Sequence, residues 1–133
     1  MSIEANKALV RRYYDEVRDQ GNTNVVDEIF AERVVGRGED MSSLEAIKQV
    51  IQNWHAGFSD NHTDIVDQIA EGDIVATHWK ATATHTGEFR GVAATGQKIE
   101  ASGSTFHRVQ DGKIVEHWGN NDMYLVSQQL GLE

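Results

Sequence analysis

The 133-residue sequence predicts a single α+β domain, in which a cone-shaped, curved antiparallel sheet packs against three N-terminal helices and encloses one pocket. Two observations carry this prediction. Apolar residues recur at helical spacing in the first half of the chain, and they alternate with a strand-like period of two in the second half. Helices followed by antiparallel strands are typical of the α+β class, and the length fits one domain over residues 1–133.

Three helices are expected in the first half. Residues 4–20 carry apolar side chains at helical spacing and are followed by Gly21, so they predict the first helix. A short helix is expected over residues 24–30. A third helix begins where Ser42 and Glu45 match a capping box, in which each side chain satisfies a backbone N–H of the other residue. The apolar stripe of this helix consists of Ile47, Val50, Ile51, Trp54 and Phe58.

The second half predicts antiparallel strands joined by turns. A first strand is expected around residues 65–69, a turn signal stands at residues 72–73, and residues 74–86 predict a long strand. The remaining expected elements are a loop over residues 87–96, strands over residues 97–109 and 113–121, and a helical turn over residues 122–130.

The composition excludes several classes of function. A net charge of −9 with only 12 Lys and Arg argues against binding to nucleic acid or to an anionic membrane. The absence of cysteine excludes disulfides, thiolate nucleophiles and cysteine-ligated metals, and it fits a cytoplasmic protein. No stretch resembles a signal peptide or a membrane span. The six histidines show no tight ligand spacing, so no metal site is expected.

Five short segments occur in the order and at the spacing of a known family. They are residues 69–73, 84–89, 94–98, 111–118 and 128–131. Together they resemble the SnoaL-like polyketide cyclases of the nuclear-transport-factor-2-like superfamily. The resemblance implies the cone fold, a buried apolar pocket, neither metal nor organic cofactor, and commonly a homodimer. The best-known members close a ring of an aromatic polyketide by an intramolecular aldol reaction.

The sequence departs from this family at both polar groups of the aldol site. The family motif resembles Glu-His-Trp-Asp, and its last residue is the proposed general acid/base. Here Gly119 stands at that place, and the family's histidine on the neighbouring strand aligns with Thr105. These departures leave the implied fold intact and point away from the family's own aldol chemistry.

The turn between the last two strands decides which side chains line the pocket. A three-residue loop over residues 110–112 would place odd-numbered residues of both strands on the pocket wall, whereas a two-residue loop would set His117 beside Phe106. The three-residue loop is favoured because the family pattern needs positions 105 and 119 on one wall.

The candidate catalytic residues are His117, His107 and Asp122. Histidine exchanges protons near neutral pH, so either histidine could replace the missing carboxylate. Alternatively, both are hydrogen-bonded wall residues without a chemical role. Strand alternation sends Asp122 to the face opposite Gly119, in solvent, and if the strand ends near residue 121 it could instead cap the closing helical turn; a place in the pocket is the alternative.

The candidate ligand-binding residues combine flat apolar walls with hydrogen-bonding groups. Trp79 suits a flat apolar ligand, although a core position is the alternative. Tyr14 could donate a hydrogen bond to an enolate oxygen, and Tyr13 is the alternative because helical neighbours point about 100° apart. The full set is Tyr14, Trp54, Phe58, Trp79, Thr105 and Asn121.

Three functional hypotheses follow. The first is a cofactor-independent cyclase, isomerase or related lyase that moves a proton on a small, aromatic or polyketide-like carbonyl compound. The second is a non-catalytic module that binds a small hydrophobic molecule, which the glycine at position 119 motivates. The third is an interaction protein whose outer sheet face carries an apolar patch of Phe106, Ile114 and Trp118. A homodimer through this face is expected and is compatible with the first two hypotheses.

Overall fold

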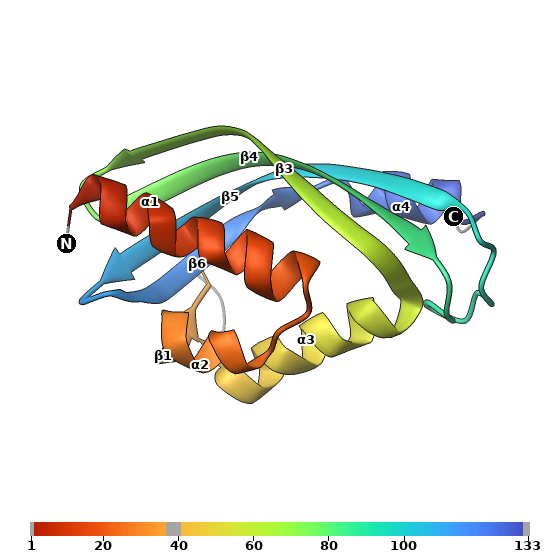
Figure 1. Cartoon of the computed structure of the whole chain (residues 1–133), viewed down its shortest axis with the longest axis horizontal. Helices are drawn as coiled ribbons and strands as arrows, with labels where there is room; N and C mark the ends of the chain where they lie inside the picture. Colours follow the sequence, from red (N-terminus) through yellow and green to blue (C-terminus); the bar gives the residue numbers. More distant parts are fainter. Residues whose placement is uncertain (1, 37–40, 132–133) are drawn as a thin grey trace.

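A computed structural model describes residues 2–36 and 41–131 and shows a curved sheet with the helical layer on one face (Figure 1). The sheet has the strand order β2-β1-β6-β5-β4-β3, and its neighbours pair antiparallel except for the parallel pair of β1 and β6. The predicted α+β class and the curved sheet are confirmed. The elements are α1 (Ile3–Arg12), η1 (Tyr13–Asp19), α2 (Asn24–Ile29), β1 (Phe30–Val35), β2 (Met41–Ser43), α3 (Leu44–Gly57), β3 (Phe58–Glu71), β4 (Ile74–His85), β5 (Lys98–Gln110), β6 (Lys113–Asn121) and α4 (Met123–Gln129).

The first predicted helix is present, but its hydrogen bonding changes halfway. It begins at Ser2, whose hydroxyl oxygen accepts a hydrogen bond from the backbone N–H of Ala5 at 3.0 Å. From Tyr13 to Asp19 the chain continues as a π-helix, and Gly21 ends it with a φ of 71°. The wider turn of a π-helix lets neighbouring side chains of η1 lie on the buried side together.

The cap of α3 lies one residue later than the sequence predicted. Ser43, rather than Ser42, is the N-cap, and its hydroxyl oxygen accepts from the backbone N–H of Ala46 at 3.1 Å. The predicted capping box was wrong because Ser42 belongs to β2, which pairs with β1. The strands β1 and β2 were not predicted, and Phe58 begins β3 instead of ending the helix.

The β5–β6 hairpin turns through two residues, so the predicted three-residue loop was wrong. Asp111 and Gly112 have φ angles of 51° and 74°, and Gln110 pairs with Lys113 across the turn. Positive φ at both central residues is the geometry of a two-residue hairpin turn, which Asp-Gly favours.

A β-bulge at Val115 nevertheless restores the predicted faces. The pairing register shifts there by one residue, so His107 pairs with His117 and Thr105 pairs with Gly119. The odd-numbered residues beyond the bulge therefore face inward. Ile114 precedes the bulge and is fully buried, so its predicted place in the outer patch was wrong.

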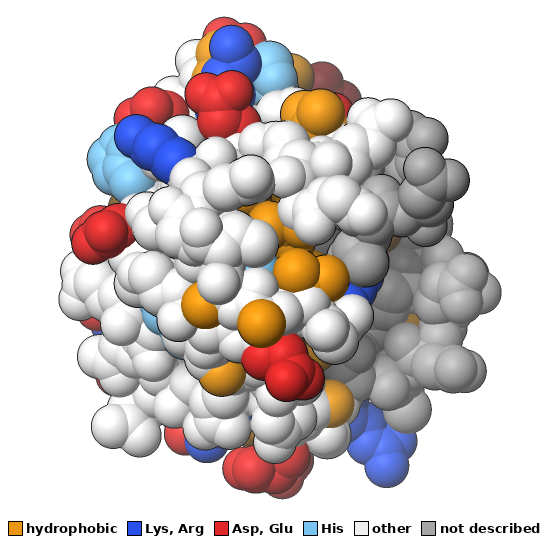
Figure 2. All heavy atoms as spheres, turned by 90° about the vertical axis from the view of Figure 1, so that its right-hand side faces the viewer, with side chains coloured by type: hydrophobic (Ala, Val, Ile, Leu, Met, Phe, Trp, Pro, Cys, Tyr) orange, Lys and Arg blue, Asp and Glu red, His pale blue; other side chains and the backbone are white. Residues whose placement is uncertain are grey.

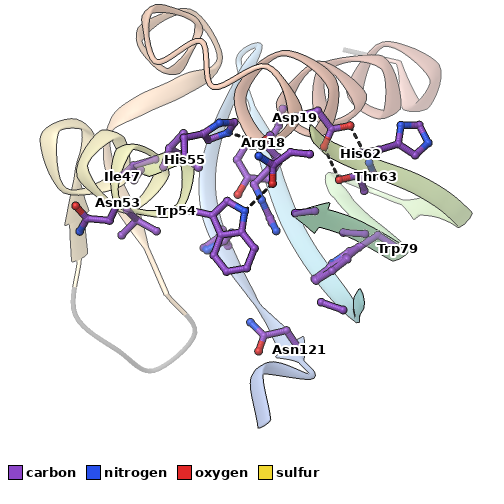
Figure 3. Close-up of a pocket in the computed structure, with 18 of the residues that line it drawn as sticks. Arg18, Asp19, Ile47, Asn53, Trp54, His55, His62, Thr63, Trp79 and Asn121 are labelled. Atoms are coloured by element: carbon purple, nitrogen blue, oxygen red, sulfur yellow. Dashed lines mark hydrogen bonds between the residues drawn. The ribbon is translucent and has the colours of Figure 1, made fainter. Parts of the chain in front are cut away.

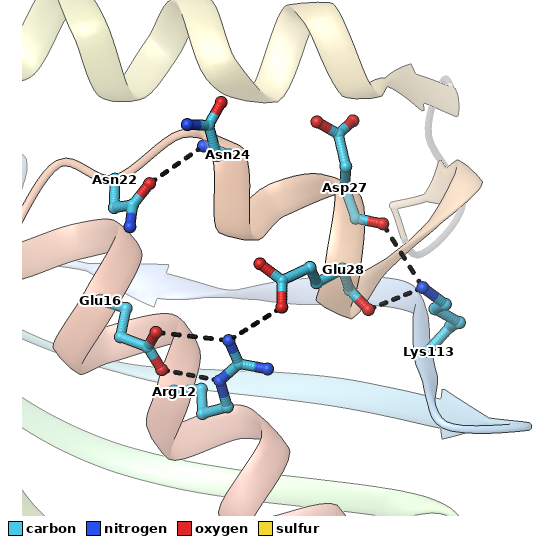
Figure 4. Close-up of polar contacts among 7 residues, drawn as sticks. All are labelled: Arg12, Glu16, Asn22, Asn24, Asp27, Glu28 and Lys113. Carbon is cyan, nitrogen blue, oxygen red and sulfur yellow. Dashed lines mark hydrogen bonds and ion pairs between the residues drawn. The ribbon is translucent and has the colours of Figure 1, made fainter.

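Charged contacts hold α2 against its neighbours (Figure 4). The ammonium group of Lys113 donates to the carbonyl oxygens of Glu28 at 2.6 Å and Asp27 at 3.4 Å, which lie at the C-terminal end of α2. These contacts satisfy carbonyls that the helix itself leaves unpaired. Arg12 pairs with Glu16 at 2.6 Å and with Glu28 at 3.3 Å, which ties the first helix to α2.

Two apolar clusters fill the space between the helices and the sheet. The larger lies beneath α1, η1 and α2, and the smaller lies near α4. At the α4 end, Figure 2 shows hydrophobic side chains reaching the surface near the middle, with acidic side chains among those around them. The smaller cluster consists of Phe58, Ala83, Ile99, Val126 and Leu130.

Within the described residues, no helix is both long and apolar enough to cross a bilayer.

Candidate functional site

A cavity of about 530 Å³ lies where the two apolar clusters meet, between α3, η1 and the inner face of the sheet. Its size is typical of sites that hold small molecules. Figure 3 shows Trp54 of α3 and Trp79 of β4 projecting into the same region, with Asn121 of β6 near its lower end. The walls are mostly apolar, and a few polar groups face the space.

Trp79 is a fixed wall of this cavity. Its indole Nε1 donates to the hydroxyl oxygen of Thr105 at 3.0 Å, and both side chains are buried. On the neighbouring strand β5, the glycine at position 103 leaves room for the indole, because a Cβ atom there would lie 2.7 Å from the Trp79 ring. Thr105 therefore positions the indole from beneath, and it is not among the residues that line the cavity.

Trp54 forms a second aromatic wall. Its Nε1 donates to the side-chain oxygen of Asn61 at 2.7 Å. Phe58 is fully buried and stacks on Trp54, with ring centroids 4.1 Å apart. Phe89 of the loop after β4 also lines the cavity and contacts both rings. Phe58 thus supports the wall instead of reaching the cavity itself.

A histidine pair stands on the sheet side of the cavity. His117 lines the cavity, and its Nδ1 lies 3.4 Å from Nε2 of the fully buried His107. The residue His117 still exposes part of its surface, but the surrounding protein partly removes its ring from water and so lowers its pKa, and the positive charge of Arg18 lowers it further. Burial also lowers the pKa of His107 well below its usual value, with smaller effects from His117 and Arg18. Both rings are therefore neutral at pH 7.

The two histidines have different capacities for a proton. His107 has the more strongly lowered pKa and no contact with the cavity, so a proton taken up by the pair stays on His117. The ring of His107 packs against Tyr13 and Tyr14, with centroids 5.3 and 6.2 Å away. His117 can therefore act as a base toward a ligand, whereas His107 can only orient the ring of His117.

The buried state of His107 predicts a loss of stability in mild acid. Its pKa in the folded protein lies below the unfolded value near 6.5, so only unfolding lets it take up a proton. Above pH 6.5 this group leaves the free energy of unfolding undiminished. As the pH decreases from 6.5 toward the folded pKa, the group should lower the free energy of unfolding by about 1.4 kcal/mol per pH unit. Replacing His107 with asparagine should remove its share of the acid slope in urea unfolding between pH 6.5 and 5 and leave the share of His117, whose pKa is also lowered.

An exposed histidine provides the control for this experiment. His78 lies on the outer face of β4, and its side chain is 45% exposed. The His78→Asn variant should keep the acid slope of the original protein. A His107→Asn variant with an unchanged slope would contradict the account of the buried ring.

The remaining candidates are divided between the cavity and the core. Tyr13 lines the cavity, whereas Tyr14 is buried behind it, and burial raises the pKa of the Tyr14 hydroxyl. Asp122 accepts a hydrogen bond from the backbone N–H of Leu125 at 3.3 Å, so it caps α4 and does not line the cavity. Asn121 lines the cavity on the same strand as His117.

Position 119 has no room for the family's carboxylate. A Cβ atom at Gly119 would lie 2.3 Å from the carbonyl oxygen of Ser104 and 2.9 Å from Cα of Thr105. Among the described residues that line the cavity, only Asp19 carries a carboxylate. Its two oxygens accept from the backbone N–H and the hydroxyl of Thr63 at 2.8 and 2.6 Å. No described group of three potential metal ligands is present either.

Arg18 is a cavity residue that the sequence analysis missed. It lies at the end of η1, with its guanidinium carbon 5.2 Å from the centre of the Trp79 ring. A basic residue in the last turn of a helix is ordinarily expected to interact with the helix dipole, so its position alone does not indicate a cavity residue. Its place in the cavity depends on the π-helical segment, for which the sequence gives no recognised signal.

Comparisons with known proteins agree with this architecture. The sequence model described as SnoaL-like polyketide cyclase matches residues 8–130. A proposed polyketide cyclase from Acidithiobacillus ferrooxidans is 29% identical, with 98% of each chain covered and a TM-score of 0.87. AclR, a proposed hydroxylase from Streptomyces galilaeus, is 27% identical, with 98% of each chain covered and a TM-score of 0.87.

A third solved structure reaches slightly higher identity. IdmH, a proposed polyketide cyclase from Streptomyces antibioticus, is 30% identical over 96% of this chain and 99% of its own, with a TM-score of 0.81. Among curated proteins, no match to the chain was found. The similar structures thus carry more than one proposed activity.

Proposed function

The chain belongs to the SnoaL-like polyketide cyclase family, and on this premise we propose a cytoplasmic, cofactor-independent enzyme of the cyclase, isomerase or lyase type. It would move a proton on a small aromatic or polyketide-like carbonyl compound. The observation that carries the proposal is the neutral ring of His117 on the cavity wall, backed by the buried ring of His107. A neutral imidazole facing an apolar cavity is a suitable general base.

The proposed step needs no group from outside the chain and its ligand. His117 takes a proton from the carbon next to the ligand's carbonyl, and the electron pair of the C–H bond moves onto the carbonyl oxygen as an enolate. The side-chain amide of Asn121 can donate a hydrogen bond to that oxygen. Where a C=C bond is conjugated with the enolate, the proton can return at the far end of that bond, which isomerises the ligand. Otherwise the α-carbon of the enolate attacks a second carbonyl, whose oxygen receives the proton.

One probe separates this enzyme from a binding module. The alternative function, non-catalytic binding of a small hydrophobic molecule, is favoured by the lack of a carboxylate at Gly119. The bicyclic ketone 2-tetralone in D₂O should exchange its α-hydrogens faster with the protein than without it, as followed by NMR. Saturable binding of 2-tetralone with no faster exchange would support the binding module instead.

A homodimer through the outer sheet face is part of the proposal. Ile69 pairs with Ala76, Ala76 with Phe106, and Phe106 with Trp118, which makes an apolar row across four strands. The rings of Phe106 and Trp118 stack with centroids 5.5 Å apart, and Ile69 is 70% exposed. An apolar row on an otherwise polar face is typical of an interface.

The mass in solution tests this interface. Light scattering should give twice the chain mass of 14.8 kDa, and Ala76→Lys, in the centre of the row, should shift the protein to the monomer. Thr84→Lys, at the far end of the same strand, is the control and should leave the dimer intact. A monomeric parent protein at high concentration would rule the dimer out.

A further inference from the structure

Arg18 gives the cavity a positively charged group beside its aromatic walls. Its guanidinium carbon lies 5.2 Å from the ring centre of Trp79 and 6.0 Å from that of Tyr13. Cation–π contacts at these distances hold the planar group between two aromatic walls. The side chain is partly buried and remains accessible from the cavity.

None of the described carboxylates forms an ion pair with this guanidinium. Asp19 is next to it in the chain, but both Asp19 oxygens are held by Thr63. The charged residues among those lining the cavity are two arginines, Arg18 and Arg90, and one aspartate. The cavity is therefore net positive in a chain whose net charge is −9.

A cation that is partly withdrawn from water is costly unless an anion joins it, and Arg18 is partly buried. A guanidinium offers parallel N–H groups that match the two oxygens of a carboxylate. His117 and His107 are neutral, so they provide no competing cation. Trp54 and Trp79 line the same space and give it two flat aromatic surfaces.

We infer that Arg18 selects ligands that carry a carboxylate, so that the cavity accepts flat aromatic acids in preference to their neutral counterparts. The carboxylate pairs with the guanidinium, and the aromatic body lies along the tryptophan walls. The inference rests on the proposed function in placing the ligand in the same cavity, where His117 faces it. Anion selection at Arg18 does not require that His117 transfer a proton.

A matched pair of probes tests the selection. 2-Naphthoate and 2-naphthamide share their shape and differ in charge, and quenching of tryptophan fluorescence reports their binding. The original protein should bind naphthoate at least about tenfold more tightly, because charge-assisted hydrogen bonds are roughly twice as strong as neutral ones. Arg18→Met should lose this preference while its affinity for naphthamide changes by less than about twofold.

Two further variants keep the outcomes distinct. Arg11→Met removes an exposed arginine near the end of α1 and should keep the full preference for naphthoate. His117→Gln should also keep it, even though the proposed proton transfer would be lost. Equal affinities for the two probes in the original protein, including no binding of either, would overturn the inference. A preference for naphthoate that survives in Arg18→Met would do the same.

Discussion

Replacing His117 with alanine should lower the rate of α-hydrogen exchange in 2-tetralone by at least about a hundredfold. A positioned general base contributes roughly that much or more. The other two histidines that line the cavity are held by protein partners, His55 by the carbonyl oxygen of Arg18 and His62 by the carboxylate of Asp64. The binding affinity for 2-tetralone should change little, because the aromatic walls remain. Exchange rates at saturating ketone and the binding constant measure the two effects separately.

The pH profile identifies the base more specifically. The neutral ring of His117 is the active form, and its pKa is lowered by burial and by Arg18. The rate should therefore be constant above pH 6.5 and fall in acid below that value. Arg18→Met removes a nearby positive charge, so it should raise the pKa of His117 and move the acid limb to higher pH.

Variants at the neighbouring histidines complete this prediction. His107→Ala should lower the rate by about tenfold or more, because the ring that orients His117 is lost. His78→Ala, on the outer face, is the control and should leave the rate unchanged. Normal exchange in both His117→Ala and His107→Ala would end the proposal of histidine catalysis.

Introducing the family's carboxylate by Gly119→Asp should destabilise the protein by about 3 kcal/mol or more instead of restoring cyclase chemistry. The new Cβ atom would lie 2.3 Å from the carbonyl oxygen of Ser104, and backbone atoms cannot move aside as a flexible side chain can. Overpacking in a well-packed region costs about 1–3 kcal/mol, and more when backbone must shift. Urea unfolding at pH 7.5 measures the change.

The next residue supplies the matched control. Asn120→Asp adds the same carboxylate to an exposed neighbouring position of β6 and should change the stability by less than about 0.5 kcal/mol. A Gly119→Asp variant as stable as Asn120→Asp would show that β5 and β6 can separate to admit the side chain. The absence of the acid would then have no steric cause.

Local patterns in the sequence predicted most of the fold. The switch from helical to alternating periodicity placed the first helix, the third helix and the three long C-terminal strands near their observed bounds. The strands β1 and β2 were missed because they are short and pair with distant partners, including a parallel pairing of β1 with β6. Such pairing is a long-range feature that periodicity does not report.

The candidate site was predicted only in part, for two physical reasons. Alternation along β6 placed His117 and Asn121 at the cavity, although the bulge at Val115, and not the loop length, sets their faces. The π-helical turn changes which residues of the first helix face inward, so Tyr13 and Arg18 line the cavity where Tyr14 was expected. Hydrogen bonds one residue longer than usual leave no recognised mark in the residue pattern.

A crystal structure of the protein with 2-naphthoate tests the central claim most directly, namely that the cavity beside His117 holds the ligand. The account predicts the naphthalene ring between Trp54 and Trp79, with carboxylate oxygens within about 3.2 Å of the Arg18 guanidinium nitrogens. An unoccupied cavity at a saturating concentration, with naphthoate ordered on the outer sheet face instead, would contradict it.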